Sequence, residues 1–425
     1  MTDLSLGIDL GTSGIRSAVV NGAGEVVSTA RGTYGPQDAA AIDATVWWNG
    51  VLECLTNQIA ALCRDDVDPA RIKRVGVDGT SGSMVLTDAD LVPVTRALIY
   101  NSDGFKEEAA QIANLAPDPH ITRGTSSALA RALRLQAEDT GNAATHLLHQ
   151  ADFIGAKLMG QGGVSDHNNA LKTGYDPEAE AWPDWYDALG LRLELLPNVL
   201  PAGAAAGPIA ADVAAQFSLS ANVVVHVGTT DSIAAFLAAA PLRLGMAVTS
   251  LGTTLAIKLL SAKRIDAPEI GLYSHRLGDG WLVGGASNTG GGALLQHFDA
   301  EQMVALSDKI DPATPSELDY YPLAKPGERF PVNDPHLAPR MGPRPADDVV
   351  YLHGLLEGIA RVERQCYDAM VARGADWPET VFTAGGGARN ATWTKIRERV
   401  LGMPLTSALE GEAAVGTARL IQSNA

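Results

Sequence analysis

The chain has 425 residues, of which 46% are hydrophobic and 19% charged, and its formal net charge is −17 at pH 7. This length predicts two or three domains, each with a core of its own. The strong negative charge argues against a nucleic-acid partner and against an anionic membrane surface, because both require basic patches. A small anionic ligand remains compatible, since backbone amides bind phosphate on acidic proteins as well.

The cysteines and the N-terminal sequence indicate the cellular compartment. The three cysteines, Cys54, Cys63 and Cys366, form no disulfide framework and no C-x-x-C zinc pair. The N-terminus carries no basic segment with an apolar run, and no apolar stretch of about 18 residues occurs. We therefore expect a cytoplasmic protein without a membrane span. The oligomeric state stays open between monomer and homodimer.

The first part of the chain predicts antiparallel hairpins, then a helix, then a buried strand. Alternating apolar residues on either side of the turn at 11–14 predict two strands, and the turn at 21–24 leads into a third. Apolar side chains at helical spacing predict a helix over 46–62. Val75–Val77 predicts the buried strand, so this part is an α/β layered domain.

A similar hairpin recurs far along the chain. The turns at 10–13 and 251–254 both read Leu-Gly-Thr followed by a hydroxyl residue, and predicted strands flank each of them. The recurrence predicts two related domains that face each other. We expect a first domain over 1–238, a second over 239–410 and a connecting helix over 411–425 that returns to the first.

Two further segments complete the predicted organisation. Residues 310–346 are dense in proline, aspartate and arginine, and they predict a long surface loop. Apolar residues at helical spacing predict a helix over 347–373.

The two Leu-Gly-Thr turns carry candidate phosphate contacts. Free amides and hydroxyls in such turns can hold phosphate oxygens. Asp9, which ends the preceding strand, can hold Mg²⁺ through its waters. An ordinary hairpin capped by aspartate explains the first turn equally well, but the pair of turns favours function. The candidate nucleotide contacts here are Gly11, Thr12, Ser13, Gly252, Thr253 and Thr254.

Asp231 is a candidate general base. It follows the predicted strand 223–227 and stands at the start of a predicted helix. An aspartate at such a position is more commonly an N-cap. Phosphoryl transfer to an alcohol, however, needs a carboxylate that accepts the hydroxyl proton. Both interpretations stay open on these residues alone.

Three consecutive glycines, Gly385–Gly387, join a predicted strand to a predicted helix that starts near Trp393. Glycines let a flat ring approach the backbone, so we favour a nucleotide site over a flexible connection. Trp393 could form a wall for the purine or simply pack in the core. The small residues of 411–418 permit close helix packing, although a surface helix is an equal alternative.

Other nucleotide and catalytic motifs are missing from the sequence. No lysine follows a glycine, which excludes a P-loop. No G-x-G-x-x-G follows a strand and no G-x-S-x-G occurs. His146 and His149 are predicted to lie on a helix, but no H-E-x-x-H accompanies them, so a zinc site is not expected.

Taken in this order, the motifs resemble those of the FGGY carbohydrate kinases, which share the actin- and hexokinase-type ATPase fold. The resemblance extends over nearly the whole chain and includes the segments 152–160 and 165–170. It implies an α/β protein with two ribonuclease-H-like domains that close on a catalytic cleft. It also implies ATP with Mg²⁺, and a small sugar or polyol as the acceptor.

The resemblance also implies roles for single residues. Asp231 resembles the catalytic base and contacts the substrate, and Asp9 resembles the Mg²⁺-linked carboxylate at the substrate. Thr12 and Thr253 resemble phosphate contacts. The expected adenosine contacts are Gly386, Gly387 and Asn390, with Trp393 as the candidate wall.

Two stretches depart from common family patterns. Residues 100–105 lack the arginine of the aromatic-x-Asp-x-Arg sugar motif, and residues 81–85 read Ser-Gly-Ser-Met-Val where xylulose kinases usually have Ser-Gly-Gln-Met-His. The short chain and the Asp-Gly-Thr-Ser segment at 78–81 resemble the compact D-ribulose kinases of plants and cyanobacteria. In that group the serine matching Ser81 touches the sugar. We therefore predict ATP-dependent phosphorylation of a ketopentose, D-ribulose to D-ribulose 5-phosphate.

Three alternatives stay open beside this prediction. The first is a xylulose, glycerol or tetritol kinase of the same family. The second is a sugar- or nucleotide-binding regulator without turnover, and the third is an ATP-driven chaperone-like switch. Asp9 and Asp231 are both present, and the sequence contains no added DNA-binding or peptide-binding segment, which disfavours the last two.

Overall fold

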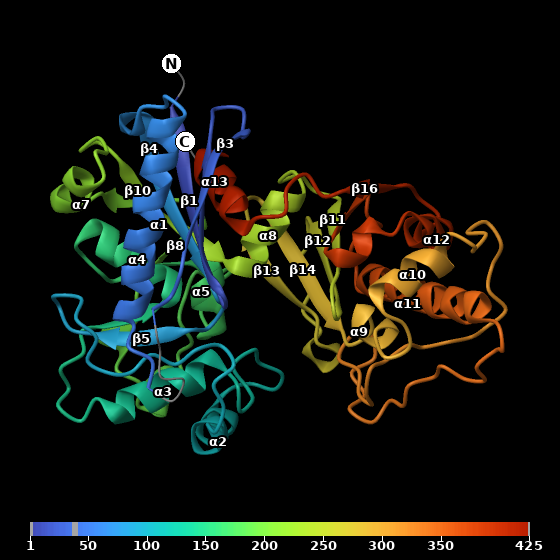
Figure 1. Ribbon diagram of the computed structural model, residues 1–425. Helices are drawn as coiled ribbons and strands as arrows, with labels where there is room; N and C mark the ends of the chain where they lie inside the picture. The colour runs from blue at the N-terminus through green and yellow to red at the C-terminus, as the bar shows by residue number, and fades with distance from the viewer. Residues whose placement is uncertain (1–2, 36–40, 424–425) are drawn as a thin grey trace. The chain divides into compact units, whose positions relative to one another are not determined.

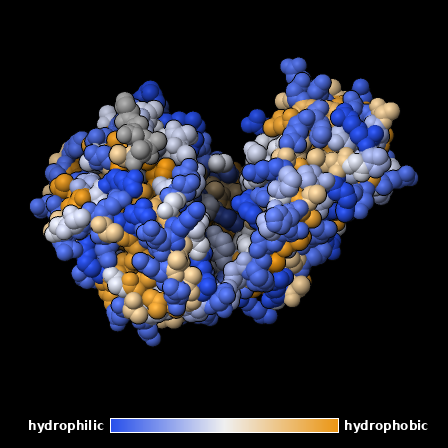
Figure 2. Space-filling view, turned by 90° about the horizontal axis from the view of Figure 1, so that it is seen from below, coloured by the Kyte–Doolittle hydropathy of each residue, from blue (hydrophilic) through white to orange (hydrophobic). Residues whose placement is uncertain are grey.

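The computed structural model describes residues 3–35 and 41–423. The chain forms two compact units, Met1–Ala238 with Glu412–Ala425, and Ala239–Gly411. Each unit is built on a six-stranded sheet flanked by helices (Figure 1). Hydrophilic residues cover most of the face of each unit that Figure 2 shows, in keeping with the net charge of −17. No helix in the described ranges is both long and apolar enough to cross a bilayer.

The first sheet begins with the antiparallel meander that the hairpin turns predict. Its strands are β1 (Leu4–Gly11), β2 (Gly14–Val20) and β3 (Val26–Gly32). β4 (Ile72–Gly79) pairs parallel with β1, β10 (Val224–Thr230) pairs parallel with β4, and β9 (Ala205–Pro208) closes the edge. The strand order is β3-β2-β1-β4-β10-β9. Because β1, β4 and β10 run in the same direction, their carboxyl ends meet at one edge of the sheet.

Helices cover both faces of this sheet. α1 (Thr45–Arg64) and α4 (Gln150–Met159) pack on the face that carries Leu6 and Ile8. Side chains alternate along a strand, so Gly7 points to the other face. There α13 (Ala413–Ser423) lies so close that a Cβ on Gly7 would come within 2.0 Å of the carbonyl oxygen of Ala414. Small residues on this face therefore set how closely the helix docks.

The first unit contains further helices and strands. They are β5 (Met84–Thr87), α2 (Lys106–Leu115), α3 (Ala128–Glu138), β6 (His146–His149), β7 (Val164–Asp166), α5 (His167–Lys172), α6 (Tyr186–Leu189), β8 (Asn198–Leu200), α7 (Ala211–Gln216) and α8 (Asp231–Ala239). The predicted helix at His146 and His149 is wrong, because this segment is strand β6. Its backbone pairs with β5, and this tertiary pairing outweighs local periodicity in so short a segment.

The second sheet repeats the arrangement of the first. Its strands are β11 (Met246–Leu251), β12 (Leu255–Ser261), β13 (Tyr273–Leu277), β14 (Gly280–Ser287), β15 (Thr380–Ala384) and β16 (Leu405–Ser407), in the order β13-β14-β12-β11-β15-β16. β11 is antiparallel to β12 and parallel to β15, as β1 is to β2 and β4. The two Leu-Gly-Thr turns thus occupy equivalent places, which confirms two related α/β domains.

The helices of the second unit are α9 (Gly291–Leu294), α10 (Ala300–Ser307), α11 (Asp348–Val371) and α12 (Ala391–Leu401). A buried ion pair links the last two. Arg397 of α12 and Glu363 of α11 are fully buried, with Nε 2.6 Å from Oε2. Thr249 of β11 donates its hydroxyl to Oε1 of Glu363 over 2.6 Å. The pair therefore joins both helices to the sheet.

The segment 310–346 contains no helix or strand, as predicted, but it is more than a surface loop. Tyr320, Leu323 and Phe330 are buried in it, and Tyr320 and Phe330 belong to the core of the second unit. Their burial requires the surrounding backbone to be held in one conformation, because the segment has no ladder of its own.

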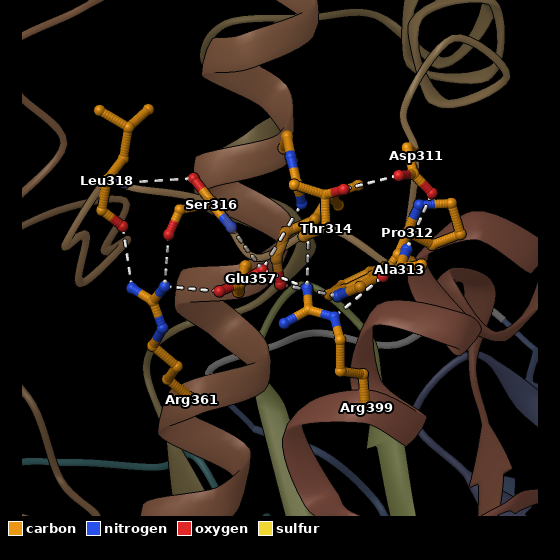
Figure 3. A network of polar contacts seen from close by, with 12 residues as sticks. Asp311, Pro312, Ala313, Thr314, Ser316, Leu318, Glu357, Arg361 and Arg399 are labelled. Carbon is orange, nitrogen blue, oxygen red and sulfur yellow. Dashed lines mark hydrogen bonds and ion pairs between the residues drawn. The ribbon is translucent and has the colours of Figure 1, made fainter.

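A polar network around Glu357 restrains the backbone of this segment (Figure 3). Glu357 of α11 forms ion pairs with Arg361 and Arg399 and accepts the backbone amide of Ser316. Arg361 also donates to the carbonyl oxygens of Ser316 and Leu318, at 3.0 and 2.8 Å. The glutamate therefore orients two arginines that bind the start of the segment.

Replacing Glu357 by glutamine is expected to lower the free energy of unfolding by roughly 2 kcal/mol, because two guanidinium groups lose their carboxylate. Burial alone would raise the pKa of this carboxyl, but His353, Arg399, the Ser316 amide and Arg361 together hold it well below its usual range. A depressed pKa stabilises the fold above the unfolded-state value of 4.5, and this contribution is lost as the pH falls below it.

Urea denaturation between pH 7 and pH 3 checks this expectation. The difference in the free energy of unfolding between wild type and Glu357→Gln should be largest above about pH 5 and should decrease below it. A gap that does not change with pH would contradict the assigned role of the charge.

Gly416 permits a close helix contact, since a Cβ there would lie 1.9 Å from the carbonyl oxygen of Ala234 on α8. We expect Gly416→Ala to cost roughly 1–3 kcal/mol through overpacking. Gly411→Ala is the matched control, because nothing lies within 4 Å of its Cβ position. Thermal unfolding of both variants tests the contact, and equal melting temperatures would refute it.

Candidate active site

Two aspartates lie side by side at the carboxyl edge of the first sheet. The parallel register pairs Asp9 of β1 with Asp78 of β4. Paired residues of adjacent strands point to the same face, so the two carboxyl groups are neighbours. Asp9 is 4% exposed and Asp78 is fully buried. Thr229 of β10 pairs with Asp78 on its other side.

Few hydrogen-bond donors or positive charges offset the cost of burying these two carboxyl groups. Thr417 of α13 donates its hydroxyl to Oδ2 of Asp78, and Oδ1 of Asp78 has no hydrogen-bond donor within the described part of the chain. Arg16 of β2 places Nη1 3.4 Å from Oδ2 of Asp9. The same guanidinium has Nε 3.1 Å from Oε2 of Glu412, so its charge is divided between two acids.

The environment disfavours charge on both aspartates. Burial raises the pKa of Asp78 well above its usual range, and the charges of Asp9 and Asp231 add to this effect. Burial also raises the pKa of Asp9, against the lowering influence of Asp78 and Arg16. Each carboxyl group influences the pKa of the other, so the two titrate as a pair. A divalent cation would favour the ionised form of both.

The donor set fits a hard cation held mainly by water and phosphate. Carboxylate oxygens are the ligands that Mg²⁺ prefers, and one or two of them suffice when substrate phosphates share the ion. The unsatisfied Oδ1 of Asp78 is a buried acceptor beside Asp9. Within residues 3–35 and 41–423, no group of three or more acidic, histidine or cysteine side chains forms a complete metal cage.

Asp231 lies at the same edge of the sheet. It directly follows β10 and is the first residue of α8. Its Oδ1 accepts the amide of Ser232 over 2.6 Å, and its charge contributes to the raised pKa of Asp78. The structure therefore brings the predicted base and the predicted metal carboxylate into one cluster.

The turn after β4 carries Ser81, the predicted sugar contact, which is partly exposed. Thr80 and Ser83 on either side are buried, with their hydroxyl oxygens 2.6 Å apart. Thr12, on the first Leu-Gly-Thr turn, donates to the hydroxyl of Tyr100 over 3.4 Å. The turn that carries Gly11, Thr12 and Ser13 thus touches the segment after β5.

The second unit contains a cavity of about 700 Å³, within the usual size of ligand pockets. It lies between the second Leu-Gly-Thr turn, the glycine segment and α9–α10. Among the predicted nucleotide contacts, its walls include Gly252, Thr253, Gly386, Gly387, Asn390 and Trp393, whereas Thr254 is exposed on the same turn outside the lining. Leu295 and Val304 give one wall an apolar surface.

The glycine segment and the start of α12 shape this cavity. A Cβ on Gly387 would lie 2.6 Å from the Trp393 ring, whereas Gly386 faces open space. Trp393 is 3% exposed and donates its indole N–H to the carbonyl oxygen of Leu356 over 3.0 Å. The tryptophan therefore supports the glycine from the core side.

Asn390 holds two walls of the cavity together. Its Oδ1 accepts the Trp393 amide over 2.9 Å and caps α12. Its Nδ2 donates to the hydroxyl of Ser307, at the end of α10, over 2.8 Å.

Sequence reasoning missed several functional candidates. Asp78 ends a strand and precedes Gly-Thr, much as Asp9 precedes Leu-Gly-Thr, so a comparison of the two strand ends could have found it. Arg16, Thr417 and Glu412 carry no such local signal, because only the folded chain brings them to the aspartates.

Comparisons with known proteins agree with this architecture. Residues 4–238 match the N-terminal domain of the FGGY family of carbohydrate kinases, and residues 247–422 match its C-terminal domain. These matches cover most of the chain, so the protein belongs to the FGGY family and is a sugar kinase.

Individual proteins are similar over nearly the whole chain, and the solved structures among them show the same fold. The xylulose kinase of Escherichia coli (strain K12) is 25% identical over 449 residues, covering 98% of this chain and 89% of the relative. The structure of a kinase from Brucella ovis superimposes with a TM-score of 0.84 at 24% identity, over 99% of this chain and 91% of that one. A gluconate kinase from Lactobacillus acidophilus gives 0.83 at 16% identity, over 100% and 89%.

Replacing Asp78 by asparagine is expected to stabilise the fold at pH 8 by at least about 1 kcal/mol. Ionising a buried acid whose pKa is raised in the folded state costs stability. That cost is absent below the unfolded-state value of 3.8 and grows as the pH rises above it. The variant cannot ionise here, so its advantage should be largest at pH 8 and vanish near pH 4.

Thermal unfolding at several pH values measures this difference. Asp212→Asn, an exposed carboxylate in the first turn of α7, is the control and should change the melting temperature little. A pH-independent effect of Asp78→Asn would show that the carboxyl is not held neutral.

Proposed function

We propose that this sugar kinase transfers the γ-phosphoryl group of ATP to a terminal hydroxyl of a ketopentose. The observation that carries the proposal is the cluster of Asp9, Asp78 and Asp231 at one edge of the first sheet. Phosphoryl transfer needs little covalent help from the protein; positioning, charge neutralisation and one proton acceptor are sufficient.

In this proposal Asp231 accepts the proton of the acceptor hydroxyl as the new P–O bond forms. Its carboxylate is partly exposed and lies at the end of a strand, where a substrate can reach it. Asp9, with the neighbouring Asp78, would hold Mg²⁺, which neutralises phosphate charge when bound. Thr12 and Thr253 would donate hydrogen bonds to phosphate oxygens.

The cavity of the second unit would take the adenosine. Its volume of about 700 Å³ and its apolar wall at Leu295 and Val304 suit a flat base. Gly386 leaves open space where the ring would approach the backbone, Gly387 lets Trp393 pack closely behind it, and Asn390 keeps α10 and α12 in place around the cavity.

D-Ribulose is our first candidate acceptor and D-xylulose the second. Ser81 on the turn after β4 supports D-ribulose through the resemblance of 78–81 to D-ribulose kinases. Relatives at 20–25% identity are named xylulose kinase, which supports the second candidate. Both sugars present a terminal hydroxyl of the same chemistry to Asp231, so the mechanism does not depend on the choice.

ADP release in the presence of D-ribulose, D-xylulose, aldopentoses, glycerol and tetritols tests the proposal. A clear preference for one ketopentose would support it and identify the acceptor. Turnover confined to glycerol or a tetritol would overturn the acceptor class and leave the phosphoryl transfer. ATP binding without any sugar-dependent ADP release would favour a regulator.

Asp231→Asn is expected to reduce sugar-dependent turnover by about 10²- to 10⁴-fold, the usual contribution of a general base. Nucleotide affinity should stay within about twofold, because the amide keeps the size of the side chain. Calorimetric titration with ATP and the ADP-release assay measure the two effects separately. Asp212→Asn is the matched control at another helix start, and substantial turnover by Asp231→Asn would rule out the base.

A further inference from the structure

An unusual buried cation lies behind the turn that carries Ser81. Arg131 of α3 is 2% exposed, yet no carboxylate forms an ion pair with it among the described residues. Burial lowers its pKa to about 10, and no neighbouring acid offsets this effect. A buried guanidinium without a counter-charge is costly, so its retention calls for a reason beyond packing.

The hydrogen bonds of Arg131 supply that reason. Nη1 donates to the carbonyl oxygen of Gly82 over 3.1 Å. Nη2 donates to the carbonyl oxygens of Tyr100 and Ser126, the latter over 2.9 Å. All three acceptors are backbone groups on three separate loops. One planar group therefore fixes the paths of three loops, whichever side chains these loops carry.

Further bonds tie two of these loops to each other and to α4. Ser83 accepts the amide of Tyr100 through its hydroxyl over 2.9 Å, and the same hydroxyl lies 2.6 Å from that of Thr80. Thr80 donates to Oε1 of Gln150, the first residue of α4, over 2.7 Å. The turn 80–83 is thus held on one side by Arg131 and on the other by α4.

The clamped segments lead directly to the aspartate cluster. The turn 80–83 follows Asp78 by two residues, and Ser81 is its partly exposed member. Tyr100 is 42% exposed, and its hydroxyl accepts from Thr12 on the first Leu-Gly-Thr turn. A shift of either loop would therefore move groups placed at the acceptor hydroxyl, while the nucleotide cavity is built from other segments.

We propose that Arg131 is the positioning residue of the acceptor pocket, because its guanidinium holds the backbone of the Ser81 and Tyr100 loops in the geometry that recognises the sugar. The inference rests on the proposed function, which places the acceptor at these loops. Arg131 acts only through the loops and touches no substrate, since it is buried beneath them.

Arg131→Lys is the decisive variant, because it keeps the charge and removes the planar fork. A single ammonium cannot reach three carbonyl groups that a guanidinium spans with separate N–H donors. We expect KM for the acceptor to rise about tenfold, since small displacements of positioning groups have large kinetic effects. KM for ATP should stay within about twofold, and the amides of 80–83 and 99–103 should exchange hydrogen faster.

Arg134→Lys on the same helix is the matched control. Arg134 forms an ion pair with Glu108 at 2.6 Å and stacks on Phe105, and it binds none of the three loop carbonyls. It should leave both KM values unchanged. If Arg131→Lys does not fold, Ser83→Ala removes the bond to the Tyr100 amide and should raise the acceptor KM in the same direction.

The outcomes separate the two proposals. A lower melting temperature of Arg131→Lys with an unchanged acceptor KM would overturn the inference and leave a purely structural arginine. If the wild-type protein phosphorylates no sugar, the proposed function fails. Hydrogen exchange then still tests whether Arg131 holds the backbone of the two loops. Faster exchange confined to the two loops would support it, and unchanged exchange would overturn it.

Discussion

The close approach of two carboxyl groups, on Asp9 and Asp78, is the constraint on which the first unit depends. Parallel pairing of β1 with β4 puts them on one face of the sheet, where burial and like charge oppose ionisation. A hydroxyl from Thr417 and a shared guanidinium from Arg16 offset part of this cost. The donor Thr417 comes from the last helix, so α13 must dock closely, which the small Gly7 permits.

The second sheet has the same strand order around its centre without the same acids. Where Asp9 pairs with Asp78 in the first sheet, Ser250 pairs with Ala384 in the second. The equivalent pair of positions is therefore uncharged, and the glycine segment follows it. One architecture thus provides an edge with paired acids, suited to a cation and a proton, and an edge without them, suited to an anionic ligand.

The sequence predicts those features of the fold that depend on residues close together in the chain. Alternating strands, the Leu-Gly-Thr turns and the glycine run at 385–387 are specified within a few residues, so the central strands of both sheets could be predicted from the sequence. The outer strands β9, β13, β14 and β16 were not predicted. The contact between Thr417 and Asp78 joins residues 339 positions apart, and no local pattern encodes it. The strand at His146 was mistaken for a helix because four residues cannot distinguish the two periods.

The two most buried arginines differ in how the cost of burying their charge is offset. Arg397 lies in the core beside Glu363, with its charge neutralised and its position fixed by two helices. Arg131 donates from Nη1 and Nη2 to loop carbonyls and keeps an uncompensated charge. A core that needed only stability could replace Arg131 with an apolar side chain of similar size. Its position below the acceptor loops fits a residue that maintains the geometry of these loops and not the stability of the fold.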